Sequence, residues 1–177
     1  MIDTGQVLLA EYEQIKQEQR ARIGFRDNLI YATLGAMAAV IGSTLARDDH
    51  LEMLLLLPPL SVILGWTYLV NDEKISAMGR YLRDELAPRC LELMPNQADA
   101  LVFGWESSHR RDVHRRSRKR FQLFVDLLTF CGAPLAALTV YWLLGPTQWP
   151  LLLISLVETT AVIGLAFQIA RYAELRG

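Results

Sequence analysis

One acidic residue stands in the middle of a long apolar stretch of the chain. Residues 149–172 read WPLLLISLVETTAVIGLAFQIARY, in which Glu158 is the only charged side chain before Arg171. An α-helix rises 1.5 Å per residue, which places Glu158 about 13 Å from Trp149, near the middle of a hydrocarbon core about 30 Å thick. An ionised acid is costly at that depth. We therefore expect Glu158 to be protonated, to face water or to be hydrogen-bonded by its neighbours.

Polar residues at a similar depth are candidates to satisfy this carboxyl group. Ser155 is one helical turn from Glu158, and Ser61 lies about ten residues into a second apolar stretch. Ser61 follows Pro58 and Pro59, which have no backbone N–H and therefore loosen the hydrogen bonding of the preceding turn. The sequence thus predicts a polar layer near the membrane midplane that contains Glu158, Ser155 and Ser61.

A second acid, Asp126, is expected nearer to the membrane surface. It lies about five residues, or roughly 7–8 Å, inside its own apolar stretch. The basic residues before that stretch are close enough to balance part of its charge: Arg118, Lys119 and Arg120. We group Asp126 with the polar residues of the spans, although its depth argues against a hydrogen-bonded pair with Glu158.

Two interpretations of Glu158 stay open at this point. Acidic residues inside membranes often belong to ion or substrate pathways, and a ring of Glu158 side chains from several subunits would line a route for cations. A proton-coupled transporter would use the same carboxyl group. In the structural interpretation, a neutral Glu158 hydrogen-bonds across helices and stabilises the bundle or the oligomer.

Four apolar stretches are long enough to position these residues across a membrane. They cover residues 28–46, 51–71, 121–144 and 149–171, and about 20 helical residues suffice to cross the hydrocarbon core. Links of about four residues join the first pair and the second pair, so each pair must form an antiparallel hairpin. We predict an all-α membrane protein with four transmembrane helices in two hairpins, flanked by cytoplasmic segments at 1–27, 72–120 and 172–177.

The basic residues predict the orientation in the membrane. Seventeen of the 18 Lys and Arg residues lie in the two ends of the chain and in residues 72–120. Since basic residues stay on the cytoplasmic side, we expect both termini and this middle segment to be cytoplasmic, in a multi-pass protein of the bacterial cell (inner) membrane. We expect four aromatic residues to anchor the spans at the interfaces: Trp66, Tyr68, Trp142 and Trp149.

The cytoplasmic segments are expected to be helical. The stripe of Leu8, Tyr12 and Ile15 suits either a partner helix or, as short stripes more commonly do, packing against the middle segment of the same chain. The second span should continue beyond residue 71 as an amphipathic helix until Pro88 ends it. A further helix is predicted after Pro95.

A basic run precedes the third span. Residues 109–120 read HRRDVHRRSRKR, and helical spacing spreads these charges around the whole helix, as suits a helix end among anionic lipid headgroups. The residues assigned to headgroup contact are Arg115, Arg116, Arg118, Lys119 and Arg120. No nucleic-acid recognition motif accompanies the run, so we expect no nucleic-acid partner.

Motifs of catalysis are missing from the sequence. We find no glycine-rich phosphate loop, no nucleophile elbow and no paired metal-ligand motif. We therefore predict that the protein is not an enzyme and uses no metal ion or cofactor.

Small residues in two spans predict close helix packing and a homo-oligomer. Small side chains about four residues apart let helix backbones approach each other in lipid. A single four-helix bundle is too narrow for a wide pore, so conduction would require several copies. The residues assigned to helix packing are Gly35, Ala39, Gly42, Gly132 and Ala136.

The plan of the first half resembles a known group of membrane proteins. The segment EYEQIKQEQRARIGFRDN, the tight first hairpin and the amphipathic DEKISAMGRYLRDEL are together similar to the SLATT group of bacterial conflict systems, whose members are predicted to form pores. The second hairpin departs from that group's two-span plan. The resemblance implies a gated pore-forming effector. We predict a channel or pore-like effector for which the cytoplasmic helices are the gate or a platform for a partner. The alternative is a non-conducting membrane anchor or scaffold that docks a cytosolic protein through residues 1–26 and 72–120.

Overall fold

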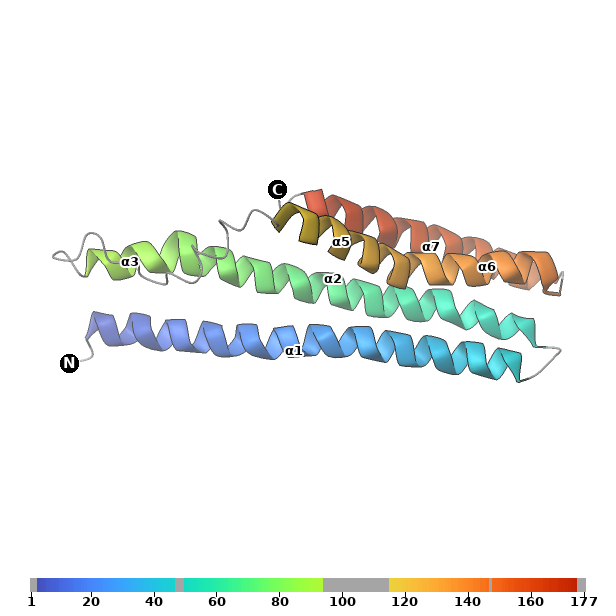
Figure 1. Ribbon diagram of the computed structural model, residues 1–177, viewed down its shortest axis with the longest axis horizontal. Coiled ribbons are helices and arrows are strands. Elements are labelled where there is room, and N and C mark those ends of the chain that lie inside the picture. Colours follow the sequence, from blue (N-terminus) through green and yellow to red (C-terminus); the bar gives the residue numbers. More distant parts are fainter. Residues whose placement is uncertain (1–2, 47–49, 94–114, 147, 175–177) are drawn as a thin grey trace. The chain divides into compact units, whose positions relative to one another are not determined.

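The computed structural model describes residues 3–46, 50–93, 115–146 and 148–174, which are helical almost throughout (Figure 1). The prediction of an all-α protein is confirmed. The elements in chain order are α1 (Thr4–Leu45), the 3₁₀ segment η1 (Leu51–Leu56), α2 (Leu57–Tyr81), the π-helical turn η2 (Leu82–Leu86), α3 (Ala87–Glu92), α5 (Arg115–Leu127), the π-helical turn η4 (Leu128–Gly132), α6 (Ala133–Leu144) and α7 (Trp149–Glu174).

The chain divides into two compact units. The first, here the helix-pair unit, combines Met1–Asp27 with Val70–Arg115. The second, here the membrane unit, combines Asn28–Leu69 with Arg116–Gly177. The helix predicted after Pro95 was expected to lead into the third span. Its part within residues 94–114 lies outside the residues that the structure describes, and α5 is helical from Arg115 onward.

The four predicted spans are present, and their surfaces are apolar on the outside. In the described residues, four helices are long and apolar enough to cross a membrane. In a soluble bundle such helices would bury most of their apolar residues, yet only 17% of the most apolar window of α7 is buried, and 28% of that in Lys119–Leu144. These exposed apolar faces are suited to contact with lipid, as in a multi-pass membrane protein.

Proline determines where helical hydrogen bonding changes. Because proline lacks an N–H and its ring crowds the carbonyl four residues earlier, it fits best in the first turn of a helix. Every proline among the described residues lies in the first three residues of a helix or in a link: Pro58, Pro59, Pro88, Pro134, Pro146 and Pro150. The 3₁₀ and π segments immediately precede three of these positions, so the chain changes its bonding pattern before the proline arrives.

The expectation that Pro88 ends the helix is therefore wrong. The turn before it, η2, widens to the π pattern, and α3 begins at Ala87 with Pro88 in its first positions. At that place a missing N–H costs no helical hydrogen bond. The helical path consequently continues to Glu92, four residues beyond Pro88.

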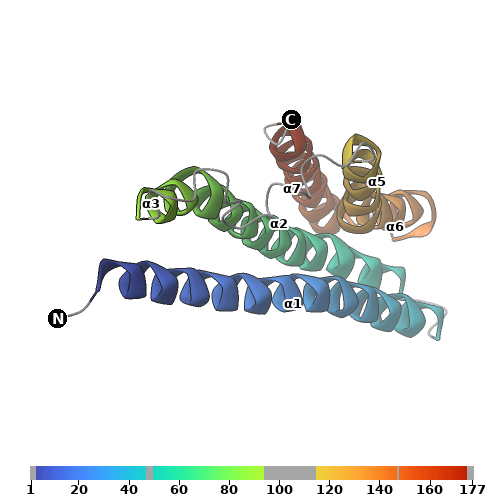
Figure 2. The ribbon, with the colours of Figure 1, turned by 60° about the vertical axis from the view of Figure 1, so that its left-hand side comes forward.

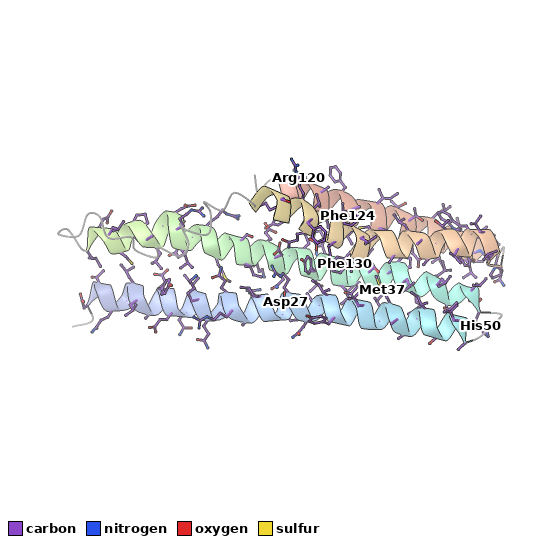
Figure 3. All side chains as sticks on the ribbon, in the orientation of Figure 1. Asp27, Met37, His50, Arg120, Phe124 and Phe130 are labelled. Carbon is purple, nitrogen blue, oxygen red and sulfur yellow. The ribbon has the colours of Figure 1, made fainter. Side chains whose placement is uncertain are left out.

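The core of the membrane unit gathers around Phe130 in η4. Phe130, labelled in Figure 3, is fully buried. Its ring packs against Gly65 of α2, where an added Cβ would lie only 3.0 Å from the ring and 2.8 Å from Leu165 Cδ2. A larger residue at Gly65 would separate these helices. α6 and α7 run side by side in both ribbon views (Figures 1 and 2), and Trp142 Nε1 of α6 donates a hydrogen bond of 2.9 Å to Ser155 Oγ of α7.

One of the predicted interfacial aromatic residues belongs to this core instead. Tyr68 is 3% exposed, its ring centroid lies 5.1 Å from that of Phe130, and its hydroxyl accepts a hydrogen bond from Gln122. The prediction for Tyr68 was wrong because the third span covers it. The tryptophans differ: Trp66, Trp142 and Trp149 all present large exposed surfaces, as anchors would.

The helix-pair unit packs the N-terminal part of α1 against the continuation of α2. Leu8, Tyr12 and Ile15 are each partly buried, and the Tyr81 hydroxyl of α2 donates a hydrogen bond to Glu11. Leu82, which follows α2 in η2, is fully buried, with 0% of its surface accessible. The stripe thus favours packing within the chain over a free face for a partner helix.

Candidate intramembrane acidic site

Glu158 lies on the inward face of α7. The buried residues of this helix are Ser155, Val162, Leu165 and Ile169, and Glu158 precedes Leu165 by seven residues, which returns it to the same side of the helix. The Glu158 side chain is partly buried. Its Oε2 atom is enclosed and has no hydrogen-bond partner.

Neighbouring contacts determine which part of α2 lies beside Glu158. Leu151 and Leu152 of α7 pack against the cluster that includes Leu55, while Leu165 lies against Gly65. Residue numbers increase in the same direction along both helices, so α2 and α7 run parallel. Gly65 of α2 contacts Leu165 of α7. Pro58 lies seven residues before Gly65, and Glu158 lies seven residues before Leu165, so Glu158 lies at the level of the proline pair.

The proline pair alters the backbone at this level. The Leu57 N–H donates to the Leu54 carbonyl, as expected at the change from the 3₁₀ segment to α2. For the Leu55 carbonyl, the residues three and four positions later are Pro58 and Pro59. Since neither has an N–H, this carbonyl receives neither a 3₁₀ nor an α-helical hydrogen bond.

Ser61 is a second buried polar group without a partner. It is 0% exposed, and its Oγ atom makes no hydrogen bond. The other buried hydroxyls of the spans behave differently, because Thr33, Thr44 and Ser155 donate to backbone carbonyls three or four residues earlier at 2.7–2.9 Å. Ser61 thus keeps an unused donor and acceptor in the interior of the membrane unit.

Ser155 has a different role from the one predicted. Its hydroxyl accepts from Trp142 Nε1 and donates to the Leu152 carbonyl at 2.8 Å, so its single proton is already used. Ser155 therefore joins α6 to α7, and it donates no hydrogen bond to Glu158. The Thr159 hydroxyl is similarly engaged, with the Ser155 carbonyl at 2.7 Å.

No family model, curated protein or solved structure matches this chain. The resemblance to the SLATT group stays a prediction. The site must accordingly be interpreted from its own chemistry. Within the four spans, no Lys, Arg or His occurs before Arg171, so the charge of Glu158 is balanced by no basic side chain of the spans.

The remaining predicted polar residues lie in α5. Asp126 is partly buried in α5, as is Lys119, while Arg120 is exposed. That Asp126 is too far from Glu158 for a hydrogen-bonded pair stays a prediction. Arg115, Arg116 and Arg118 belong to α5, but their side chains lie outside the described part of the structure, so contact of the basic run with lipid headgroups stays a prediction.

The small residues predicted to pack helices are mostly uncovered within one chain. Gly35, Ala39 and Gly42 lie on the exposed face of α1, and a Cβ at either glycine would meet nothing within 4 Å. Ala136 is also exposed, and the only atoms near Gly132 belong to its own helix. In the membrane unit, close approach between helices occurs instead at Gly65, which the pattern of small residues did not indicate.

A polar cluster in the helix-pair unit escaped the sequence analysis. Asp72 and Asn71 are buried, and Arg26 donates to Asp72 Oδ1 at 3.1 Å. Asn71 Nδ2 donates to the backbone carbonyl of Arg22 at 2.8 Å, and Arg22 Nη1 donates back to Asn71 Oδ1 at 3.3 Å. The available signal was an Asn-Asp pair directly after the second span and two arginines one turn apart just before the first.

Proposed function

We propose that this multi-span membrane protein passes small cations across the membrane as an oligomeric channel or pore-like effector, with Glu158 in the pathway. The observation that carries the proposal is the enclosed Glu158 Oε2, which has no hydrogen-bond partner although it lies midway along an apolar helix. An acidic group in this position is costly and needs a reason. Binding a cation or a proton in transit supplies one.

The structural interpretation of Glu158 fits this arrangement less well. A carboxyl group that locks helices together does so through a hydrogen bond to a neighbouring helix. The link between α6 and α7 is made by Ser155 and Trp142 instead, one turn away. The packing of this region therefore has its own polar contact, and the free oxygen of Glu158 is left for another purpose.

Self-association is part of the proposal. The face of α1 that contains Gly35, Ala39 and Gly42 is exposed in the single chain, and small residues of this spacing admit a second helix at close range in lipid. The pathway would then be completed by further copies.

Gating through the helix-pair unit follows from the continuity of α1. This helix is unbroken from Thr4 to Leu45 and contributes residues to both units. A partner or signal that binds the N-terminal part of α1 would therefore act on a helix that also forms the first span.

Ion flux through the purified protein in liposomes tests the proposal. Wild type is expected to conduct, and Glu158→Gln is expected to lower the flux by about tenfold or more at equal assembly, because the amide preserves size but removes the charge. Asp126→Asn serves as a matched control for loss of an acid elsewhere in the spans. Equal flux in wild type and Glu158→Gln would remove Glu158 from the mechanism, and absence of flux in both would favour the anchor or scaffold.

A further inference from the structure

Two buried oxygen atoms without partners lie close in height on the facing sides of α2 and α7. Ser61 precedes Gly65 by one turn, and Glu158 precedes Leu165 by two turns, while Gly65 and Leu165 are in contact. With 1.5 Å per residue, these steps are about 6 Å and about 10.5 Å in the same direction. The two residues are therefore offset by only about 4.5 Å along the helices, which a glutamate side chain can span.

A third oxygen belongs to the backbone at the same level. The Leu55 carbonyl lacks both helical donors because residues 58 and 59 are prolines. Side chains of a helix tilt toward its N-terminus, so Glu158 leans toward the level where Leu151 and Leu152 pack against the cluster of Leu55, Leu138 and Tyr141. The Glu158 carboxylate and the Leu55 carbonyl are therefore both directed toward the N-terminal end of α2, where η1 ends.

We propose that the Glu158 carboxylate, the Ser61 hydroxyl and the Leu55 carbonyl form a binding site for one monovalent cation inside a single protomer, and that a proton competes for it. The proposal rests on the proposed function and adds to it the class of ion and two further ligands. The pathway would then contain one complete site in every copy, rather than a site that exists only where several copies meet.

The charges of these ligands select a monovalent ion. One carboxylate balances one positive charge, and the hydroxyl and carbonyl dipoles replace part of the hydration shell without adding charge. A broken helix whose carbonyls are freed is a common setting for Na⁺ and H⁺ binding in membrane proteins. A divalent ion would keep a net charge in the hydrocarbon region, which is costly.

Competition with a proton follows from the same atoms. When Glu158 is protonated, its O–H can donate to the Leu55 carbonyl, and the Ser61 hydroxyl can donate to a carboxyl oxygen of Glu158, so each of the three groups gains a hydrogen bond. When a cation enters, the proton must leave because the carboxylate now supplies the ligand. Either ion satisfies the site, and the two exclude each other.

Labelling with the hydrophobic reagent dicyclohexylcarbodiimide tests the site without measuring flux. This carbodiimide adds to a protonated carboxylic acid and spares a carboxylate that holds a cation. The full-length protein in detergent would be labelled in choline chloride, then in LiCl, NaCl or KCl at the same ionic strength, and the modified Glu158 peptide quantified by mass. We expect labelling in choline and at least about fivefold slower labelling with one of the smaller cations.

Substitutions assign the two further ligands. Ser61→Ala should still be labelled at Glu158 in choline, and it should raise the cation concentration needed for protection, relative to its own labelling in choline, by about tenfold. The double variant Pro58→Ala/Pro59→Ala, which supplies N–H donors to the Leu55 carbonyl, should also weaken protection. Thr33→Val is the matched control, since Thr33 is an equally buried hydroxyl whose proton already bonds the Leu29 carbonyl.

The outcomes separate this inference from the proposed function. Failure of Glu158 to react, lack of protection by all three cations, or protection that Ser61→Ala leaves unchanged would each overturn the inference. If flux still depended on Glu158 in that case, the proposed function would stand without this site. Protection that depends on Ser61, in a protein that shows no flux, would support the site and contradict the conducting role.

Discussion

The two units differ in how some of their buried polar groups are satisfied. In the helix-pair unit, Asn71 and Asp72 are buried and each has a partner on α1, through Arg22 and Arg26 respectively. In the membrane unit, Ser61 Oγ and Glu158 Oε2 are enclosed without a hydrogen bond. We interpret the buried groups that have partners as structural, and we propose that Ser61 and Glu158, which lack them, are functional.

This difference has an energetic basis. A buried polar group with a partner recovers most of its desolvation cost, while an unpartnered one does not. The cluster around Asp72 can therefore be understood as a stabilising contact that sets the register of α1 against α2. The pair of Ser61 and Glu158 lowers stability in the empty state, and a bound ion would offset that loss.

Removing Asp72 should produce the largest loss of stability. Asp72→Ala leaves Arg26 without its partly buried carboxylate partner on α2, and we expect the free energy of unfolding to fall by about 2 kcal/mol, less than for a fully buried pair because a quarter of the Arg26 side chain is exposed. Denaturation in detergent measures it. The neighbouring exposed acid gives the control, since Glu73→Ala should change stability little. Equal effects of the two variants would refute the structural role of the cluster.

Filling Gly65 should have a smaller effect, confined to the membrane unit. A Cβ there would lie 2.8 Å from Leu165 Cδ2, and we expect Gly65→Ala to lower the free energy of unfolding by about 1 kcal/mol through overpacking. Gly164→Ala is the matched control because a Cβ at Gly164 meets nothing within 4 Å. If Gly65→Ala were as stable as Gly164→Ala, the helices at this level would pack less closely than described.

Enlarging Gly35 should change stability least and assembly most. Because a Cβ at Gly35 meets nothing within one chain, Gly35→Leu is expected to alter the free energy of unfolding by less than about 1 kcal/mol. It should nevertheless reduce the oligomer in favour of monomer, as measured by light scattering after size exclusion. Gly164→Leu, also in an open position, provides a comparison on another helix. An unchanged oligomer in Gly35→Leu would exclude this face of α1 from the interface.

The sequence predicts the spans well because length and apolarity are local properties. It predicts a special environment for Glu158 for the same reason. One prediction failed where a distant segment decides, because the third span covers Tyr68. Another failed locally, because the turn directly before Pro88 changes to the π pattern and the helix passes the proline.

The candidate site was only partly predictable. The prolines and Ser61 were recognised from their place in the second span, but the engagement of Ser155 by Trp142 depends on how α6 meets α7. The pairing of Arg26 with Asp72 joins residues 46 positions apart, which no local pattern indicates. Gly65 is a single glycine without a repeat around it, and only its neighbours Phe130 and Leu165 show why it must be small.

Measuring flux and thermal stability together on Glu158→Gln and Asp72→Asn tests the central claim most directly. The claim is that partnered buried groups maintain the fold and unpartnered ones bind the ion. It predicts that Glu158→Gln loses flux at unchanged or higher melting temperature, and that Asp72→Asn melts earlier while the folded protein conducts as wild type does. Loss of stability in Glu158→Gln with normal flux would contradict the claim.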